Sequence, residues 1–214
     1  MTRPPHPPPS SPPLILASSS PRRRELLAET GYEFCVVPPP TDVECGVCSE
    51  SGPAGLVAEL AFRKAAAVVR SLQDQAECRA RGRAGSPNLV IVAADTVAEC
   101  DGFVLGKPQD EAQARTMLRQ LRGREHRVLT GLCLWRIGDR APLVRVAVTT
   151  LRMDPLSDAQ LDEYLASGQW EGKAGAFGYQ DRLGWLRIVE GSESNVVGLP
   201  LEMLAEMLVE LRAT

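Results

Sequence analysis

The sequence lacks several features on which whole classes of protein depend. No apolar run in its 214 residues approaches the ~18 residues that a membrane span needs. The first residues, Met-Thr-Arg-Pro-Pro-His, contain no apolar signal core, so we expect a cytoplasmic protein that is not exported. The net charge of −3 includes no basic excess, which argues against a binder of nucleic acid polymers or of membrane surfaces.

Cysteine and histidine are too few to build a structural framework. The six cysteines are irregularly spaced in a chain of this size, which is typical of reduced thiols rather than disulfides. Cys45 and Cys48 form a lone CxxC, and a zinc site usually needs a second ligand pair. Neither of the two histidines is placed to supply that pair, so we interpret the two thiols as ordinary loop residues.

Lysine is the scarcest charged residue. Only three of the 24 basic residues are lysines, namely Lys64, Lys107 and Lys173. An ammonium group is a compact, strongly hydrated point charge, so a chain that otherwise uses arginine can retain lysine where that property matters. Chance explains the small number of lysines equally well. The residues around each lysine therefore have to show whether it has a functional role.

The composition that remains is sufficient for one well-packed core. Hydrophobic residues make up 44% of the chain and charged residues 24%, and a chain of this size buries about 70% of its extended surface on folding. Residues 1–13 hold seven of the 17 prolines and show no helix or strand pattern. We therefore expect a disordered proline-rich tail over residues 1–13, followed by a single domain over residues 14–214.

Hydrophobic periodicity predicts alternating strands and helices. The predicted strands cover 14–17, 33–37, 89–94, 126–137, 142–153 and 186–189, and the predicted helices cover 21–30, 53–72, 110–121, 157–167 and 201–211. The most apolar strand ends at Asp95 and leads into a hairpin around Asp101-Gly102. Elements in this order indicate an α/β protein with a mixed sheet.

Three segments carry residue types that suit phosphate chemistry. Ser18-Ser19-Ser20-Pro21 joins a strand to a helix N-terminus and is followed by three arginines, which together offer backbone N–H groups and bidentate donors to an anion. Asp95 lies at the predicted strand end, where open α/β sheets bind ligands. Lys107 lies between Gly106 and Pro108 just before a helix. Each segment alone also fits an ordinary cap, turn or helix breaker.

Two further loops extend this pattern. The segment from Gly172 to Gln180 is rich in small residues that let a backbone approach a ligand, and the Gln180 amide can read a base edge. Asp42 and Glu44 have a spacing that suits oxygen ligation of a hard cation, although surface acids usually have no such role. Taken together, the basic groups, Asp95 and these acids indicate a polyphosphate ligand with a divalent metal ion.

Six motifs, taken as a set, resemble those of the Maf family. In chain order they are Ser18 to Leu27, Ala94-Asp95-Thr96-Val97, Gly106-Lys107-Pro108, Gly123 to Gly131, Lys173 to Gln180, and Asn195 to Leu201. The resemblance implies a mixed α/β fold with an elongated, twisted sheet flanked by helices and a cleft between two lobes. It also implies a cytoplasmic nucleoside triphosphate pyrophosphatase of nucleotide-pool house-cleaning, often a homodimer, that releases pyrophosphate and a nucleoside monophosphate.

The resemblance also assigns roles to residues. Asp95 matches the proton acceptor, with Lys64 and Lys107 as further catalytic groups. The implied substrate-binding residues are Ser18, Arg22, Arg23, Thr96, Lys173 and Gln180. Glu44, or alternatively Asp42, matches a carboxylate that would bind Mg²⁺ or Mn²⁺ together with Asp95.

Three functions follow from the resemblance. The combination of Arg22, Thr96 and Gln180 resembles the branch that acts on dTTP and UTP. One alternative is a nucleotide-binding regulator of septum formation with little turnover, and the other is a pyrophosphatase for 7-methyl-GTP. Gly172 stands where the family commonly has Asp, which is a departure from the family pattern.

Overall fold

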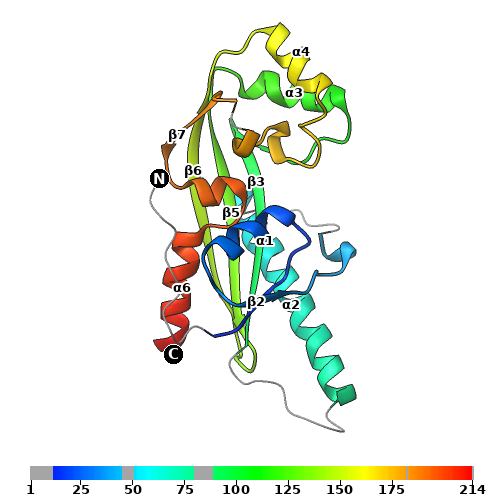
Figure 1. Ribbon diagram of the computed structural model, residues 1–214, viewed down its shortest axis with the longest axis vertical. Helices are drawn as coiled ribbons and strands as arrows, with labels where there is room; N and C mark the ends of the chain where they lie inside the picture. The colour runs from blue at the N-terminus through cyan, green and yellow to red at the C-terminus, as the bar shows by residue number, and fades with distance from the viewer. Residues whose placement is uncertain (1–11, 45–50, 80–88, 182, 214) are drawn as a thin grey trace.

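One mixed sheet organises the chain in the computed structural model, which describes residues 12–44, 51–79, 89–181 and 183–213 (Figure 1). Its seven strands are β1 (Leu14–Leu16), β2 (Phe34–Val36), β3 (Val90–Cys100), β4 (Phe103–Leu105), β5 (Glu125–Arg136), β6 (Leu143–Met153) and β7 (Leu186–Glu190). The strand order is β2-β1-β3-β5-β6-β7, with β4 paired to β3. β1 is parallel to β2 and β3, and the other pairs are antiparallel. The predicted tail lies outside the described residues except for residues 12 and 13.

Some of the helices begin at a side chain that caps them. Asp110 accepts a hydrogen bond from the Gln113 amide at 2.7 Å, and Ser157 forms a reciprocal capping box with Gln160. The helices are α1 (Pro21–Glu29), α2 (Gly52–Arg79), α3 (Glu111–Leu121), α4 (Asp158–Ala166), α5 (Glu193–Val197) and α6 (Leu201–Ala213). Short 3-10 turns form η1 (Thr41–Glu44), η2 (Ala174–Ala176) and η3 (Tyr179–Asp181).

The helices cover the sheet in three places (Figure 1). α1 and α6 pack on one face of the lower sheet through a core that includes Leu27 and Leu204. α2 packs on the opposite face through Ala61, Ala65 and Val68. α3 and α4 form a separate lobe with η2 at the upper end of the long strands. The predicted fold class, a mixed α/β sheet flanked by helices, is thereby confirmed.

The predicted boundaries were wrong at β3. The sequence predicts a strand that ends at Asp95, but β3 continues to Cys100, so Asp95 lies in the middle of a strand. The physical reason is that β5 forms an antiparallel ladder with β3 from Val90 to Glu99, which carries the strand past the polar residues. α2 is likewise longer than predicted, since it ends at Arg79, and the short helix α5 was missed.

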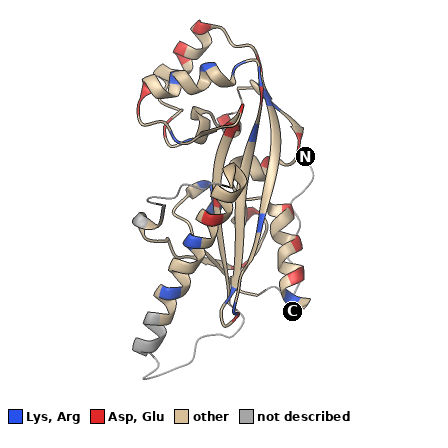
Figure 2. Cartoon of the chain, turned by 180° about the vertical axis from the view of Figure 1, so that it is seen from behind, with Lys and Arg blue, Asp and Glu red and all other residues tan. Residues whose placement is uncertain are grey.

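The distribution of charged residues and the polarity of the helices both match what the composition predicts. Figure 2 shows acidic and basic residues interspersed along the part of the chain that the structure describes. Of the helices in that part, none combines the length and the apolar character that a membrane crossing requires.

Gly131 sets the distance between α2 and the sheet. It lies in β5 opposite Asp95 of β3. A Cβ atom built on Gly131 would overlap the backbone carbonyl of Val57 in α2, and backbone cannot move aside as a flexible side chain can. Glycine at this position therefore allows α2 to approach the sheet closely enough for its side chains to reach β3.

We expect Gly131→Ala to destabilise the protein. The added methyl group forces α2 away from β5, so the free energy of unfolding should fall by about 1–3 kcal/mol, as overpacking does elsewhere. Urea denaturation measures this change. Gly106→Ala is the control, because a Cβ there meets no atom within 4 Å. Equal stabilities of the two variants would contradict the proposed close approach.

Candidate functional site

The site is built on an opening in the sheet beside β3. On the edge of β3 away from β5, β1 pairs only with residues 90–92 and β4 only with residues 98–100. Between them, no strand of the described chain pairs with residues 93–97 on that edge. Asp95 and Thr96 therefore lie beside a cavity, although their strand is central to the fold.

Asp95 points from β3 toward α2. Its Oδ1 atom accepts a hydrogen bond from Nζ of Lys64 at 2.5 Å, and the two residues are 9% and 5% exposed. A buried ion pair of this kind fixes the position of both groups, and removing one partner is strongly destabilising. The pair therefore holds a carboxylate and an ammonium group at the wall of the cavity.

Thr96 points to the opposite face of the sheet, as strand alternation requires. Its hydroxyl accepts a hydrogen bond from Nη2 of Arg23 at 3.0 Å and shares another with the Thr130 hydroxyl at 2.9 Å. Nε of Arg23 donates to the carbonyl of Gly198 at 2.7 Å, and the Thr130 hydroxyl donates to the carbonyl of Asn195 at 3.2 Å. One guanidinium group thus joins α1, β3 and the end of α5.

The start of α1 lies at the same cavity. Ser20 is the N-cap residue, as predicted, but its side chain makes no capping hydrogen bond. Instead, Oγ of the buried Ser18 accepts the Ser20 amide at 3.2 Å and Nη1 of Arg23 at 3.5 Å. The helix N-terminus, with its partial positive charge, is therefore placed where an anion would bind.

Two adjoining pockets are formed around these groups. The charged pocket, with a volume of about 550 Å³, is lined by Ser18, Arg23, Lys64, Asp95 and Lys107 among others. The apolar pocket, of about 120 Å³, lies on the Thr96 face and is lined by Ala98, Val128, Leu151, Phe177 and Leu186 among others. Both pockets are bordered by Ser20, Arg22, Arg23, Thr96, Lys107 and Gly172.

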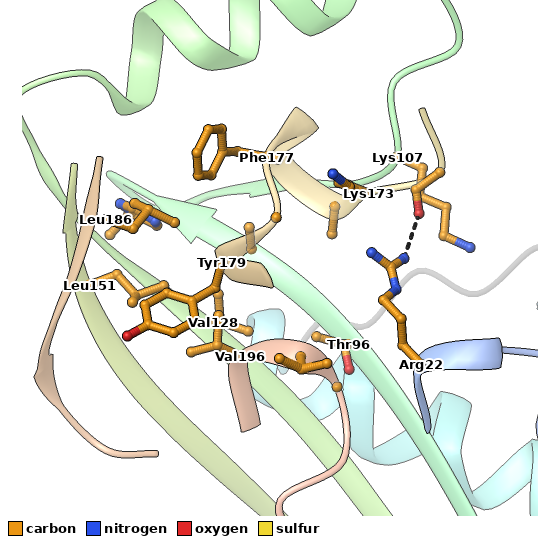
Figure 3. A pocket seen from close by; sticks show the side chains of 18 of the residues that line it. Arg22, Thr96, Lys107, Val128, Leu151, Lys173, Phe177, Tyr179, Leu186 and Val196 are labelled. Carbon is orange, nitrogen blue, oxygen red and sulfur yellow. Dashed lines mark hydrogen bonds between the residues drawn. The ribbon is translucent and has the colours of Figure 1, made fainter. Parts of the chain in front are cut away.

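The apolar and the charged side chains of the apolar pocket lie at different ends of it. Val128, Leu151 and Leu186 lie toward one end of the apolar pocket, and Arg22 lies toward the other (Figure 3). Nη2 of Arg22 donates a hydrogen bond to the backbone carbonyl of Gly172 at 3.2 Å. Gly172 is the residue that departs from the Asp of the family pattern. A ligand with a charged end and an apolar end therefore fits the combined site.

Lys173 forms a buried ion pair that the sequence analysis missed. Its Nζ donates to Oδ1 of Asp181, and these side chains are only 12% and 8% exposed. Oδ2 of Asp181 accepts the Tyr164 hydroxyl at 2.8 Å and the Gly178 amide at 3.2 Å. Lys173 lines the apolar pocket, and Asp181 fixes it there. Asp181 directly follows Gln180, but nothing in the sequence signalled the pairing.

Three predicted site residues are only partly described. Gln180 lies in η3, and Asp42 and Glu44 lie in η1, while their side chains lie outside the described part of the structure. The structure thus brings together Ser18, Arg22, Arg23, Lys64, Asp95, Thr96 and Lys107 around the charged pocket. Their roles toward a substrate stay predictions.

The described residues fit a divalent cation that arrives with a phosphate ligand. Among them, no group of three or more His, Cys, Asp or Glu side chains could hold a metal ion by itself. Mg²⁺, however, is commonly bound by one or two carboxylates together with substrate phosphates. Of the described residues that line the charged pocket, Asp95 carries the carboxylate, so it is the candidate ligand for such a cation.

His126 is a further buried titratable group beside the site, in addition to the two buried ion pairs. It is 5% exposed and lines the apolar pocket. Burial lowers the pKa of His126 below its ordinary value of 6.5, while the backbone of Arg124 and the charge of Glu99 partly oppose this effect. The folded protein therefore keeps this ring neutral.

We expect His126 to make stability depend on pH. Below about pH 6.5 the unfolded chain binds a proton at His126 that the folded chain binds only at lower pH, so stability falls as the pH falls through this range. His126→Asn removes this component. Urea denaturation of both proteins at about pH 7.5, 6.5 and 5.5 measures it, since all other groups cancel in the difference. Parallel stability curves would contradict the buried neutral ring.

A comparison with known families identifies the family of the chain. The family whose sequence model matches the chain is described as Maf-like protein, and the match covers residues 13–211. The chain belongs to the Maf family. The resemblance found in the six sequence motifs is thereby confirmed.

Several dTTP/UTP pyrophosphatases are similar to this protein over most of the chain. A dTTP/UTP pyrophosphatase of Rhodopirellula baltica is 49% identical over 185 residues, which cover 86% of this chain and 75% of the relative. A dTTP/UTP pyrophosphatase of Symbiobacterium thermophilum is 44% identical over 87% of each chain. A third, from Ruminiclostridium cellulolyticum, is 35% identical over 87% of this chain and 90% of its own.

Proposed function

We propose that this protein is a nucleoside triphosphate pyrophosphatase that hydrolyses dTTP and UTP. Water attacks the α-phosphorus, and the bond from the α-phosphorus to the oxygen that bridges the α- and β-phosphates breaks. The products are a nucleoside monophosphate and pyrophosphate. The observation that carries the proposal is the continuity of the charged pocket with the apolar pocket across Arg23 and Thr96. The names of the similar Maf proteins support this substrate class.

In this proposal the charged pocket binds the triphosphate. Arg22, Arg23 and Lys107 supply cationic donors, and the N-terminus of α1 supplies backbone N–H groups. Asp95 accepts the proton of the attacking water, because it is the carboxylate that the fold fixes at the cavity wall. Lys64 positions Asp95 and offers positive charge to the reacting phosphate.

A divalent cation completes the proposed site. Asp95 and Glu44, or Asp42 in place of Glu44, would hold Mg²⁺ or Mn²⁺. When bound, the cation neutralises phosphate charge and lowers the pKa of a bound water. We also propose a cytoplasmic location and a homodimer, on the basis of the family alone.

A nucleotide panel tests the function. Pyrophosphate release should be measured with dTTP, UTP, CTP, ATP, GTP and 7-methyl-GTP in the presence of Mg²⁺ or Mn²⁺. We expect dTTP and UTP to be hydrolysed fastest. Binding of nucleotide without turnover would favour the septum regulator, and a preference for 7-methyl-GTP would favour the other branch of the family.

Asp95→Asn tests the proton acceptor. The variant keeps the shape of the side chain but removes its negative charge, so turnover of dTTP should fall at least ~100-fold, in line with typical acid–base contributions. The binding of dTTP should change little. Since Lys64 loses the carboxylate that it bonds, the melting temperature should also fall, and assays belong well below it. A folded variant with near-parental turnover would exclude Asp95 as the base.

Removal of divalent cations tests the metal. Dialysis against EDTA should reduce dTTP hydrolysis to background, and either Mg²⁺ or Mn²⁺ should restore it, because phosphoryl transfer depends on neutralised phosphate charge. The melting temperature should stay the same without nucleotide, since the cation is held largely by the substrate. Full activity in EDTA would show that the basic residues neutralise the phosphate charge without a metal ion, and would contradict the proposed cation.

A further inference from the structure

One carboxylate beside the apolar pocket has no role in the proposed hydrolysis. The side chain of Asp181 is only 8% exposed, and its Oδ1 atom accepts Nζ of Lys173. Its Oδ2 atom accepts the Tyr164 hydroxyl at 2.8 Å and the Gly178 amide at 3.2 Å. Asp181 itself lines neither of the two pockets. Any effect of this carboxylate on a ligand therefore passes through the three groups that it holds.

The bond between Lys173 and Asp181 joins the two ends of one segment. Lys173 directly precedes η2 and Asp181 is the last residue of η3, so the ion pair closes residues 173–181 into a ring. Most residues of this ring line the apolar pocket, namely Lys173, Ala174, Gly175, Phe177, Gly178 and Tyr179. The ring is therefore one wall of that pocket.

The backbone of the ring needs restraints to keep its conformation. Ala176 has a φ of 62°, in the left-handed region that residues with a Cβ atom rarely adopt. Such a backbone persists only where the surrounding structure holds it. Asp181 holds the chain on both sides of Ala176, since it bonds the side chain of Lys173 before it and the amide of Gly178 after it.

The ring is anchored to two other parts of the protein. Near its beginning, the Gly175 amide donates to the carbonyl of Gly106, which lines the charged pocket, at 3.0 Å. At its end, Asp181 joins the ring to α4 through the hydroxyl of the buried Tyr164. The position of the wall relative to the charged pocket therefore depends on both anchors.

We propose that Asp181 is a positioning residue for recognition of the base, because it holds residues 173–181 as the wall that the base contacts. This inference rests on the proposed function, which places the triphosphate in the charged pocket and leaves the apolar pocket for the base. Gln180, which the sequence predicts to read a base edge, directly precedes Asp181 in η3. Specific recognition needs groups held to within about half an ångström. A wall that shifts therefore loses selectivity among bases.

The charges of these groups suit contact with a neutral base. Nζ of Lys173 would bring a positive charge to the apolar pocket, and the Asp181 carboxylate balances it. Burial, together with the bond to Asp181, raises the pKa of Tyr164 above its ordinary value of 10.0. The Tyr164 hydroxyl therefore stays protonated, and remains a donor to Asp181, from neutral to moderately alkaline pH.

The test is the selectivity between UTP and CTP, which differ only at the edge of the base. Asp181→Asn keeps the shape of the side chain, but its amide has one acceptor oxygen where Asp181 receives three donors. We expect this variant to lower the ratio of kcat/KM for UTP to kcat/KM for CTP at least ~10-fold, the factor that one hydrogen bond to the base is worth.

Asp162→Asn is the matched control. It makes the same chemical change in α4, where the Asp162 side chain is 59% exposed and pairs with Arg115. The control should keep the parental ratio. A folded Asp181→Asn protein with the parental ratio would overturn the inference. Equal losses with UTP and CTP would do the same, because they would show that Asp181 only supports the fold. A parent protein that hydrolyses both nucleotides equally would instead overturn the proposed dTTP/UTP specificity.

Tyr164→Phe tests the same restraint without touching the ion pair. It removes the hydroxyl that holds Asp181 but keeps the ring that packs against Phe177 and Trp185. We expect the UTP-to-CTP ratio to fall at least about threefold. Combined with Asp181→Asn, it should lower the ratio no further than Asp181→Asn alone, because both changes break one network. An unchanged ratio in Tyr164→Phe, or fully additive losses in the double variant, would contradict the inference.

Discussion

The site depends on a mismatch between the length of β3 and the lengths of its neighbours on one edge. β5 pairs with β3 almost from end to end, so the strand is rigid throughout. On the other edge, β1 and β4 are each three residues long and cover only its ends. The middle of a central strand therefore has one edge on which no described strand pairs, and this edge borders the charged pocket. Residues placed there combine the rigidity of a core strand with access to a ligand.

Strand alternation then divides the site between two faces of the sheet. Asp95 points to α2, where the close approach at Gly131 allows Lys64 to reach it. Thr96 points to the opposite face, where Arg23 joins it to the chain after α5. Consecutive residues of one strand thus serve a charged pocket and an apolar pocket. A nucleotide, with a triphosphate at one end and a base at the other, matches that division.

The residues with local signals were predictable, and those with distant partners were not. Ser18 and Lys107 lie in segments marked by Pro and Gly, and both line the charged pocket as expected. Asp181 carries no such mark, yet it holds Lys173 and accepts the Tyr164 hydroxyl, because a loop and a helix are brought together by packing. Asp95 was predicted to be a site residue at a strand end, but it lies within β3, since the ladder with β5 cannot be read from one strand.

The sequence by itself determined the α/β class, the positions of most strands and helices, and the residue types gathered for phosphate chemistry. These follow from periodicity and from short motifs, which act over a few residues. The tertiary structure alone decided that β3 continues through Asp95 and that Lys64 meets its carboxylate across 31 positions. Each of these depends on contacts between segments distant in the chain, whose geometry is fixed only when the sheet and its helices pack together.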